Sequence, residues 1–236
     1  PHKLNCQRPP TPGVASLMTD PTQTPVNTLL IGGGGGEHAL AAGLRRSAVI
    51  GELHVTHPQN PGIARLARAV DVPVSKAEIY RLRQYCDRHD IRLVVIGPEA
   101  PLAEGFGDAL RTDTRLVFGV DADGARLESD KAWAKQLMRA ASIPTAEGRA
   151  FTNAERAIAF LESRDERHVV KATGLAAGKG VLVPESLEQA VAFVNECMVA
   201  KRFGQAGASV LIEEMLEGPE VSVLALVDGR NIYVLE

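Results

Sequence analysis

The sequence predicts an α/β protein, in which a parallel sheet in the first half is followed by an α+β unit. Short apolar runs alternate with segments of helical periodicity from Asn27 onward. This alternation changes beyond Asp121, and a glycine-rich segment at 168–184 joins two runs of strand-forming residues. Strands that are separated by helices imply a parallel sheet with both faces covered, so binding groups are expected at the carboxyl ends of its strands.

We expect residues 1–26 to form a disordered tail, because they are rich in proline and poor in apolar residues. The predicted domains are 27–124, an N-terminal α/β domain, and 125–236. In the first domain we expect strands at 27–31, 52–56, 92–96 and 115–118, and helices at 37–46 and 76–89. In the second we expect helices at 129–142, 154–163 and 187–200, a strand after 143–147, the glycine-rich hairpin, and a strand at 209–214.

The amino-acid composition of the chain limits the kinds of binding partner that are expected. The 236 residues carry a net charge of −3, with 26 basic and 29 acidic residues spread along the chain. Such a balance gives no electrostatic footprint for nucleic acid or an anionic membrane, so small-molecule partners are expected. The chain has three widely spaced cysteines and no apolar run of membrane-spanning length. A cytoplasmic location is therefore the expectation.

The glycine-rich segment at 168–184 predicts a phosphate-binding flap. It is not a Walker loop, because Gly174 and Gly178 are too closely spaced and a β-branched run follows Gly180 where a helix would have to begin. A glycine loop between two strands can offer backbone N–H groups to a triphosphate, while Lys171 and Lys179 supply positive charge. The alternative is an ordinary flexible hairpin with two solvated lysines.

Five consecutive glycines, 32–36, follow the first predicted strand and precede a helix. The third position of a dinucleotide fingerprint falls on Glu37, and the expected acidic residue after the second strand is missing, so a nicotinamide cofactor is not expected. What remains suits a single phosphate at a helix N-terminus. The alternative gives Glu37 only a helix-dipole role and leaves His38 as a packed surface histidine.

Two further segments contain candidate ligand-binding carboxylates. The prolines of 97–102 stiffen the backbone around Glu99, which favours a carboxylate aimed at a hydroxyl or an amine, although a plain rigid turn is the alternative. The run 213–220 follows a strand and places acids at Glu213 and Glu220 around the apolar Leu216. This spacing suits an adenosine, and the alternative is a charged turn between strands.

Together these segments resemble the ATP-grasp superfamily and, within it, the phosphoribosylamine–glycine ligase family, also called glycinamide ribonucleotide synthetases. The similar segments occur in the order typical of that family, and they lie at 31–40, 95–102, 127–133, 143–147, 170–181, 203–207 and 212–220. The resemblance implies an N-terminal pre-ATP-grasp domain and an incomplete ATP-grasp domain, truncated at its C-terminal side.

The resemblance also implies a reaction of de novo purine biosynthesis. ATP phosphorylates the carboxylate of glycine, and the amine of 5-phosphoribosylamine attacks the glycyl phosphate, giving glycinamide ribonucleotide, ADP and phosphate. By motif position, the residues expected to bind ATP are Lys131, Lys171, Gly178, Lys179, Gly180, Glu213, Leu216 and Glu220. Those expected to bind phosphoribosylamine are Gly34, Gly35, Glu37, Asn60 and Glu99. The residue that would act as catalyst is not identified.

The sequence departs from the family pattern at several positions. Gly36 stands where the family usually has arginine, which removes a charge near the expected substrate phosphate. Thr173 replaces an aspartate, and Gln59 and Pro61 alter a second loop. Relatives continue past Glu236, and the ligands for Mg²⁺ or Mn²⁺ are expected there, so no complete metal site is expected in this chain.

Two other functions stay open at this level. The chain could act as a nucleotide-binding module without ligase activity, or as a sister ATP-grasp enzyme acting on another ribonucleotide, although residues 97–102 argue against the latter. The sequence does not predict the oligomeric state. A grasp sheet that ends at Val234 would expose apolar surface and unpaired backbone, so we expect poor solubility.

Overall fold

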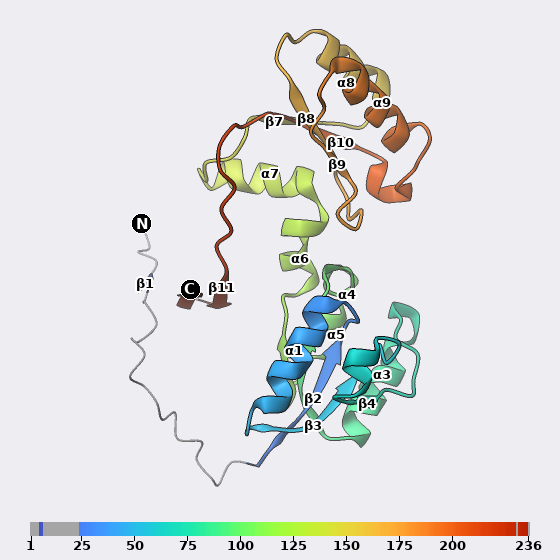
Figure 1. Cartoon of the computed structure of the whole chain (residues 1–236), viewed down its shortest axis with the longest axis vertical. Helices are drawn as coiled ribbons and strands as arrows, with labels where there is room; N and C mark the ends of the chain where they lie inside the picture. Colours follow the sequence, from blue (N-terminus) through green and yellow to red (C-terminus); the bar gives the residue numbers. More distant parts are fainter. Residues whose placement is uncertain (1–4, 7–23, 230, 236) are drawn as a thin grey trace. The chain divides into compact units, whose positions relative to one another are not determined.

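The computed structural model describes residues 5–6, 24–229 and 231–235. Residues 24–215 form one compact unit, and the two terminal segments form another (Figure 1). The predicted disordered tail lies mostly outside the described residues, although Asn5–Cys6 form a strand and Val26 already begins the first strand of the large unit. Among the described helices, none is both long and apolar enough to cross a bilayer.

The N-terminal sheet confirms the predicted parallel topology. Its five strands lie in the order β4-β3-β2-β5-β6, and all neighbours pair in parallel. The strands are β2 (Val26–Ile31), β3 (Ile50–Val55), β4 (Arg68–Ala69), β5 (Ile91–Ile96) and β6 (Leu116–Phe118). The three central strands, β3, β2 and β5, end side by side, so the loops that follow them gather at one edge of the sheet.

Helices cover both faces of this sheet, because alternate strand residues point to opposite sides. Leu30 and Val55 pack with α1 and α2 on one face, whereas Leu29 and Ile31 pack with α3 and α5 on the other. The helices of this half are α1 (Gly35–Arg46), α2 (Pro61–Ala64), α3 (Ile79–Arg88, preceded by the 3₁₀ turn η1, Lys76–Glu78), α4 (Glu99–Ala103), α5 (Phe106–Leu110) and α6 (Ala122–Ser129).

The segment 97–102, predicted as a stiff loop, contains the start of a helix. Pro98 occupies the N-cap of α4, and Pro101 lies in its first turn. Proline fits there because the first N–H groups of a helix have no intrahelical acceptor, so its missing N–H costs little. Glu99 is consequently the first residue of a short helix. The helices α2, α5 and α6 were likewise not predicted.

The second sheet is antiparallel, in the order β7-β10-β8-β9. Its strands are β7 (Gly148–Phe151), β8 (His168–Ala172), β9 (Val181–Leu182) and β10 (Val210–Glu214), and its helices are α7 (Lys131–Ala140), α8 (Ala154–Glu162) and α9 (Leu187–Met198), with the 3₁₀ turn η2 (Gly204–Gly207). Figure 1 shows α8 and α9 on one side of this sheet and α7 on the other. Val170 and Ile212 face α8 and α9 in the core.

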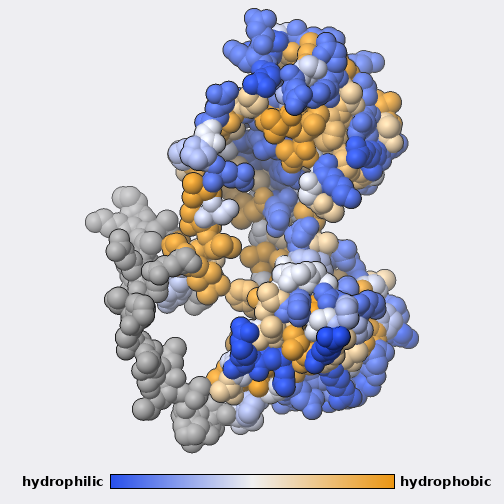
Figure 2. All heavy atoms as spheres, viewed as in Figure 1, coloured by the Kyte–Doolittle hydropathy of each residue, from blue (hydrophilic) through white to orange (hydrophobic). Residues whose placement is uncertain are grey.

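The terminal unit contains β11 (Ala225–Asp228) and β12 (Asn231–Val234), an antiparallel pair, with β1 (Asn5–Cys6) parallel to β12. The segment that leads into β11 carries exposed apolar side chains, including Val221 at 77% and Val223 at 73% exposure, and Figure 2 shows this hydrophobic run in orange. The poor solubility expected from the sequence stays a prediction.

Arg115 connects three elements of the N-terminal half. Its side chain is 5% exposed, Nε donates to the Ile91 carbonyl at 3.0 Å, and Nη1 donates to the Leu110 carbonyl at 3.2 Å. Nη2 forms an ion pair with Asp87 at the end of α3. One guanidinium therefore joins the ends of α3 and α5 to the start of β5.

We predict that Arg115→Met lowers the free energy of unfolding by about 2–3 kcal/mol, because two carbonyls lose a charged donor. Urea unfolding monitored by circular dichroism would measure it. The control is Arg92→Met on β5, whose side chain is exposed and whose loss should cost under about 0.5 kcal/mol. Equal losses in the two variants would show that Arg115 does not connect these elements.

Candidate functional site

The glycine loop at the start of α1 is built by close packing against Glu37. Only Gly32–Gly34 form a loop, because Gly35 and Gly36 already belong to α1. The Glu37 carboxylate accepts a hydrogen bond from Gly34 N at 2.6 Å. A Cβ atom at Gly32 would lie 2.5 Å from Glu37 Cγ, and one at Gly97 would collide with the carboxylate itself. These glycines therefore leave room for the Glu37 side chain to cap its own helix.

Asn60 holds the glycine loop from the other side. Its Nδ2 donates to the Gly33 carbonyl at 3.0 Å, and its Oδ1 accepts from Gly62 N and Ile63 N at the start of α2. Thr56 adds a further tie, since its hydroxyl accepts from Gly32 N at 3.2 Å. The amide of Asn60 is thus already bonded to backbone groups, so it supports the loop directly.

Open space remains at the N-terminus of α1. A Cβ atom at Gly35 or Gly36 would meet no heavy atom within 4 Å. Helix N-termini carry unpaired N–H groups and a partial positive charge, which favour a phosphate. Glu99, half-buried at the start of α4, follows β5, the strand next to β2. The structure therefore brings Gly34, Gly35, Glu37, Asn60 and Glu99 to the carboxyl edge of the first sheet.

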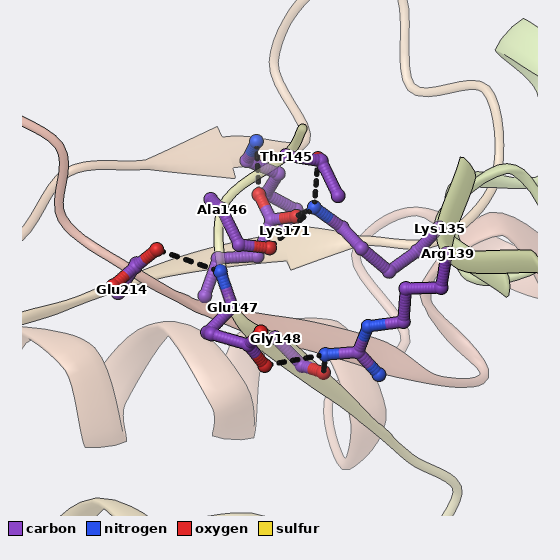
Figure 3. Close-up of polar contacts among 9 residues, drawn as sticks. Lys135, Arg139, Thr145, Ala146, Glu147, Gly148, Lys171 and Glu214 are labelled. Carbon is purple, nitrogen blue, oxygen red and sulfur yellow. Dashed lines mark hydrogen bonds and ion pairs between the residues drawn. The ribbon is translucent and has the colours of Figure 1, made fainter. Parts of the chain in front are cut away.

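The second group of predicted residues lies around α7, β8 and β10. Lys131 and Lys135 are one helical turn apart, so they share a face of α7. Lys131 Nζ donates to the Gly174 carbonyl at 2.9 Å, at the base of the glycine-rich hairpin. Lys135 is 6% exposed, and its Nζ bonds Thr145 Oγ1 at 2.6 Å, the Ala146 carbonyl at 2.8 Å and Glu213 Oε1 at 2.5 Å. Figure 3 shows Lys135 reaching from α7 to Thr145 and Ala146.

Strand register places Lys171 against the same carboxylate. Leu211 of β10 pairs with Lys171 of β8, so Glu213 is the diagonal neighbour of Lys171 on the sheet face that α7 covers. Lys171 Nζ forms an ion pair with Glu213 Oε2. Glu213 is 5% exposed, and each of its oxygens bonds one lysine, whereas Lys171 is 31% exposed. We name Lys135, Glu213 and Lys171 the charge cluster.

Electrostatics at this site favour an anion. Burial raises the pKa of Glu213, but hydrogen bonds from Lys135 and Lys171 outweigh it, so the net pKa lies below that of an ordinary glutamate. Burial lowers the pKa of Lys131, and the ammonium of Lys171 lowers it further, against a smaller opposing effect of Glu128. Lys131 Nζ bonds the carbonyl of Gly174, three residues after Lys171, so both lysines lie at the base of the hairpin, an arrangement that suits a polyphosphate.

The glycine-rich hairpin forms between β8 and β9, as predicted. Lys179 N donates to the Ala176 carbonyl at 2.9 Å, and Ala177 and Gly178 between them have φ values of 48° and 76°. This is the geometry of a tight hairpin turn with two left-handed residues. The tip, 177–179, is exposed, and Gly180 is buried. Gly178, Lys179 and Gly180 thus lie on a hairpin that continues the Lys171 strand.

The hydroxyl and the backbone carbonyl of Thr173 are both hydrogen-bonded within the protein. From the resemblance, an aspartate was expected at this position. The hydroxyl of Thr173 lies 2.7 Å from Ser209 Oγ, and its backbone carbonyl accepts from Lys131 N at 2.9 Å. Gly174 N donates to the Ala206 carbonyl at 2.9 Å. A hydroxyl pair therefore anchors the base of the hairpin, without a charge.

Leu216 and Glu220 follow β10 in the terminal unit, and both side chains are exposed. Their assignment to ATP binding stays a prediction. Lys135 of the charge cluster, and Thr145, which it bonds, were not assigned a role from the sequence. The one available signal was Lys135, a second lysine one turn after Lys131 on the same helix face.

The described residues do not by themselves suit a divalent cation. None of their His, Cys, Asp and Glu side chains gather in threes with the geometry of a metal site. Glu213, the buried carboxylate nearest the convergent lysines, has both oxygens bonded to ammonium groups. A Mg²⁺ ion would meet positive charge at this point, so this carboxylate does not suit it as a ligand.

Two family descriptions match consecutive parts of the chain. Residues 26–128 match the N domain of phosphoribosylglycinamide synthetase, and residues 129–236 match its ATP-grasp (A) domain. The match boundary lies at the end of α6, and the domain boundary expected at 124 stays a prediction.

Individual proteins agree with these matches. The chain is 44% identical over 210 residues to phosphoribosylamine–glycine ligase of Nostoc sp., covering 89% of this chain and 49% of that protein. It is 44% identical over 205 residues to the human trifunctional purine biosynthetic protein adenosine-3, covering 86% of this chain and 20% of that protein. The solved phosphoribosylamine–glycine ligase of Thermotoga maritima superposes with a TM-score of 0.66 at 29% identity, covering 89% of this chain and 49% of that one.

The chain thus spans about half the length of the bacterial relatives that it matches. The two matched domains are contiguous and together include all of the site residues described above. Residues 26–236 therefore belong to the phosphoribosylglycinamide synthetase family, as its N domain followed by its ATP-grasp domain.

Proposed function

We propose that this chain forms the ATP-binding and phosphoribosylamine-binding part of an ATP-dependent carbon–nitrogen ligase of purine biosynthesis. The enzyme joins glycine to 5-phosphoribosylamine through glycyl phosphate and releases ADP and phosphate. The observation that carries the proposal is the position of Lys131 and Lys171 at the base of a glycine-rich hairpin, where Lys131 Nζ bonds the Gly174 carbonyl. Named relatives that are 41–44% identical support the choice of substrates.

In this proposal the triphosphate of ATP lies against Lys131 and Lys171, and Gly178, Lys179 and Gly180 close over it. The ammonium groups stabilise negative charge on the phosphoryl group as it moves from ATP to the glycine carboxylate. Leu216 and Glu220 contact the adenosine. Glu213 faces the adenine, and its carboxylate fixes the positions of Lys135 and Lys171. A divalent cation would supply further positive charge to the phosphates of ATP, and none of the described residues is assigned to hold it.

Phosphoribosylamine binds at the carboxyl edge of the first sheet. Its phosphate lies at the open N-terminus of α1, next to Gly34 and Gly35, and Glu37 and Asn60 keep that loop in shape. Glu99 points its carboxylate at a hydroxyl or the amine of the sugar. The amine then attacks the carbonyl carbon of glycyl phosphate and expels phosphate.

We predict that Lys171→Met in the complete protein lowers glycine-dependent ADP release by about 100-fold or more, because a charge that acts on the transferring phosphoryl group is lost. A coupled assay of ADP measures the rate. The control, Lys76→Met, removes an exposed lysine from the first half of the chain and should retain the wild-type rate. Unchanged turnover in Lys171→Met would refute the flap assignment. ATP binding without glycine-dependent ADP release would favour a nucleotide-binding module.

We predict that the affinity for ADP falls as the pH rises in the alkaline range, because the pKa of Lys131 is lowered. As the pH rises through that pKa, Lys131 loses its charge and ADP binding weakens, at a lower pH than for an ordinary lysine. In Lys171→Met, one cause of the lowering is absent, so the midpoint should move to higher pH. Calorimetric titration of ADP across the alkaline range measures both midpoints. An identical midpoint in the two proteins would contradict the proximity of the ammonium groups.

We predict that Gly97→Ala raises the apparent KM for phosphoribosylamine by about 10-fold to 100-fold, because its methyl group displaces Glu37 and misplaces the glycine loop. The KM for ATP should stay near its wild-type value. Gly43→Ala is the matched control, since a Cβ atom at this position of α1 meets no heavy atom within 4 Å. If the KM for ATP alone increased, the assignment of the glycine loop to phosphoribosylamine would be wrong.

A further inference from the structure

The charge cluster contains one lysine that cannot touch a ligand. The ammonium of Lys135 has three donors, and they are directed at Thr145 Oγ1, the Ala146 carbonyl and Glu213 Oε1, at 2.6, 2.8 and 2.5 Å. The side chain is 6% exposed. Whatever Lys135 contributes to nucleotide binding must therefore act through Glu213.

Lys171 differs from Lys135 both in the exposure of its side chain and in the number of its donors that are already bonded. Its side chain is 31% exposed, and its ion pair among the described residues is with Glu213 Oε2. An ammonium group has three donors, so this pairing leaves capacity for the oxygens of a ligand. Glu213 thus fixes the position of the lysine that faces the proposed phosphate site.

Fixing a lysine with a carboxylate has an electrostatic cost. A pair of Lys171 and Glu213 alone is neutral, and the carboxylate would weaken attraction for a phosphate. Lys135 changes this balance, because one carboxylate between two ammonium groups leaves a net charge of +1. The lowered pKa of Glu213 is consistent with its remaining ionised between them.

We propose that Lys135 is a positioning residue for ATP binding, which offsets the charge of Glu213 so that Lys171 is held in place and still attracts phosphate. This inference rests on the proposed function. The other reading is that Lys135 only stabilises the fold by pairing a buried carboxylate, because a buried charge without a partner is strongly destabilising. The two readings predict different nucleotide affinities for variants that fold equally well.

The experiment compares Lys135→Met with the double variant Lys135→Met/Glu213→Gln in the complete protein. Calorimetry measures Kd for ADP, and the ADP-release assay measures KM and kcat for ATP. We expect Lys135→Met to raise Kd and KM by about tenfold, because the cluster becomes neutral. The double variant restores the net charge of +1 and should recover most of that loss. Lys135→Arg, which keeps the charge, should bind ADP better than Lys135→Met.

Thermal unfolding shows which variants are folded, and Lys135→Gln replaces Lys135→Met if the latter does not fold, since it removes the same charge while keeping a hydrogen-bond donor. A wild-type Kd in the folded single variant would overturn the inference. So would a lower affinity that the double variant does not recover. If the wild-type protein itself binds no ADP, the proposed function fails instead.

Discussion

The ATP-grasp half of the chain depends on one buried carboxylate, Glu213. A buried charge is tolerated only when it is paired and hydrogen-bonded, and here α7 and β8 each supply a lysine to β10. Through Lys135 the same interaction extends to Thr145 and Ala146, so it also determines where the chain enters β7. The position of Lys171, and of the hairpin that follows it, results from this pairing.

At the edge of the first sheet, a glycine loop is held in one conformation while the space beside it stays open for a ligand. Glu37 and Asn60 bond the loop from two sides, while the glycines they contact leave room for them. The open positions, Gly35 and Gly36, lie one and two residues further, on the helix. The packed glycines of the loop and the open positions on the helix thus lie within five residues of each other. The loop can therefore keep its shape while a ligand occupies the open positions.

The sequence predicted most elements, because periodicity and glycine spacing are local signals, whereas the roles of its two groups of candidate site residues stay predictions. It missed α4 because two prolines suggest a loop, although proline is tolerated in the first helical turn. It also missed the role of Lys135. Burial and strand register decide which charges meet, and the meeting of residues 135, 171 and 213 is a tertiary property that no local pattern contains.

A crystal structure of the complete protein with a non-hydrolysable ATP analogue would show whether the charge cluster positions Lys171 for ATP. We expect phosphate oxygens within hydrogen-bond distance of the ammonium groups of Lys131 and Lys171, with Glu213 still bonded to both Lys135 and Lys171. A triphosphate bound away from these lysines, or a Glu213 carboxylate released from them, would contradict this expectation.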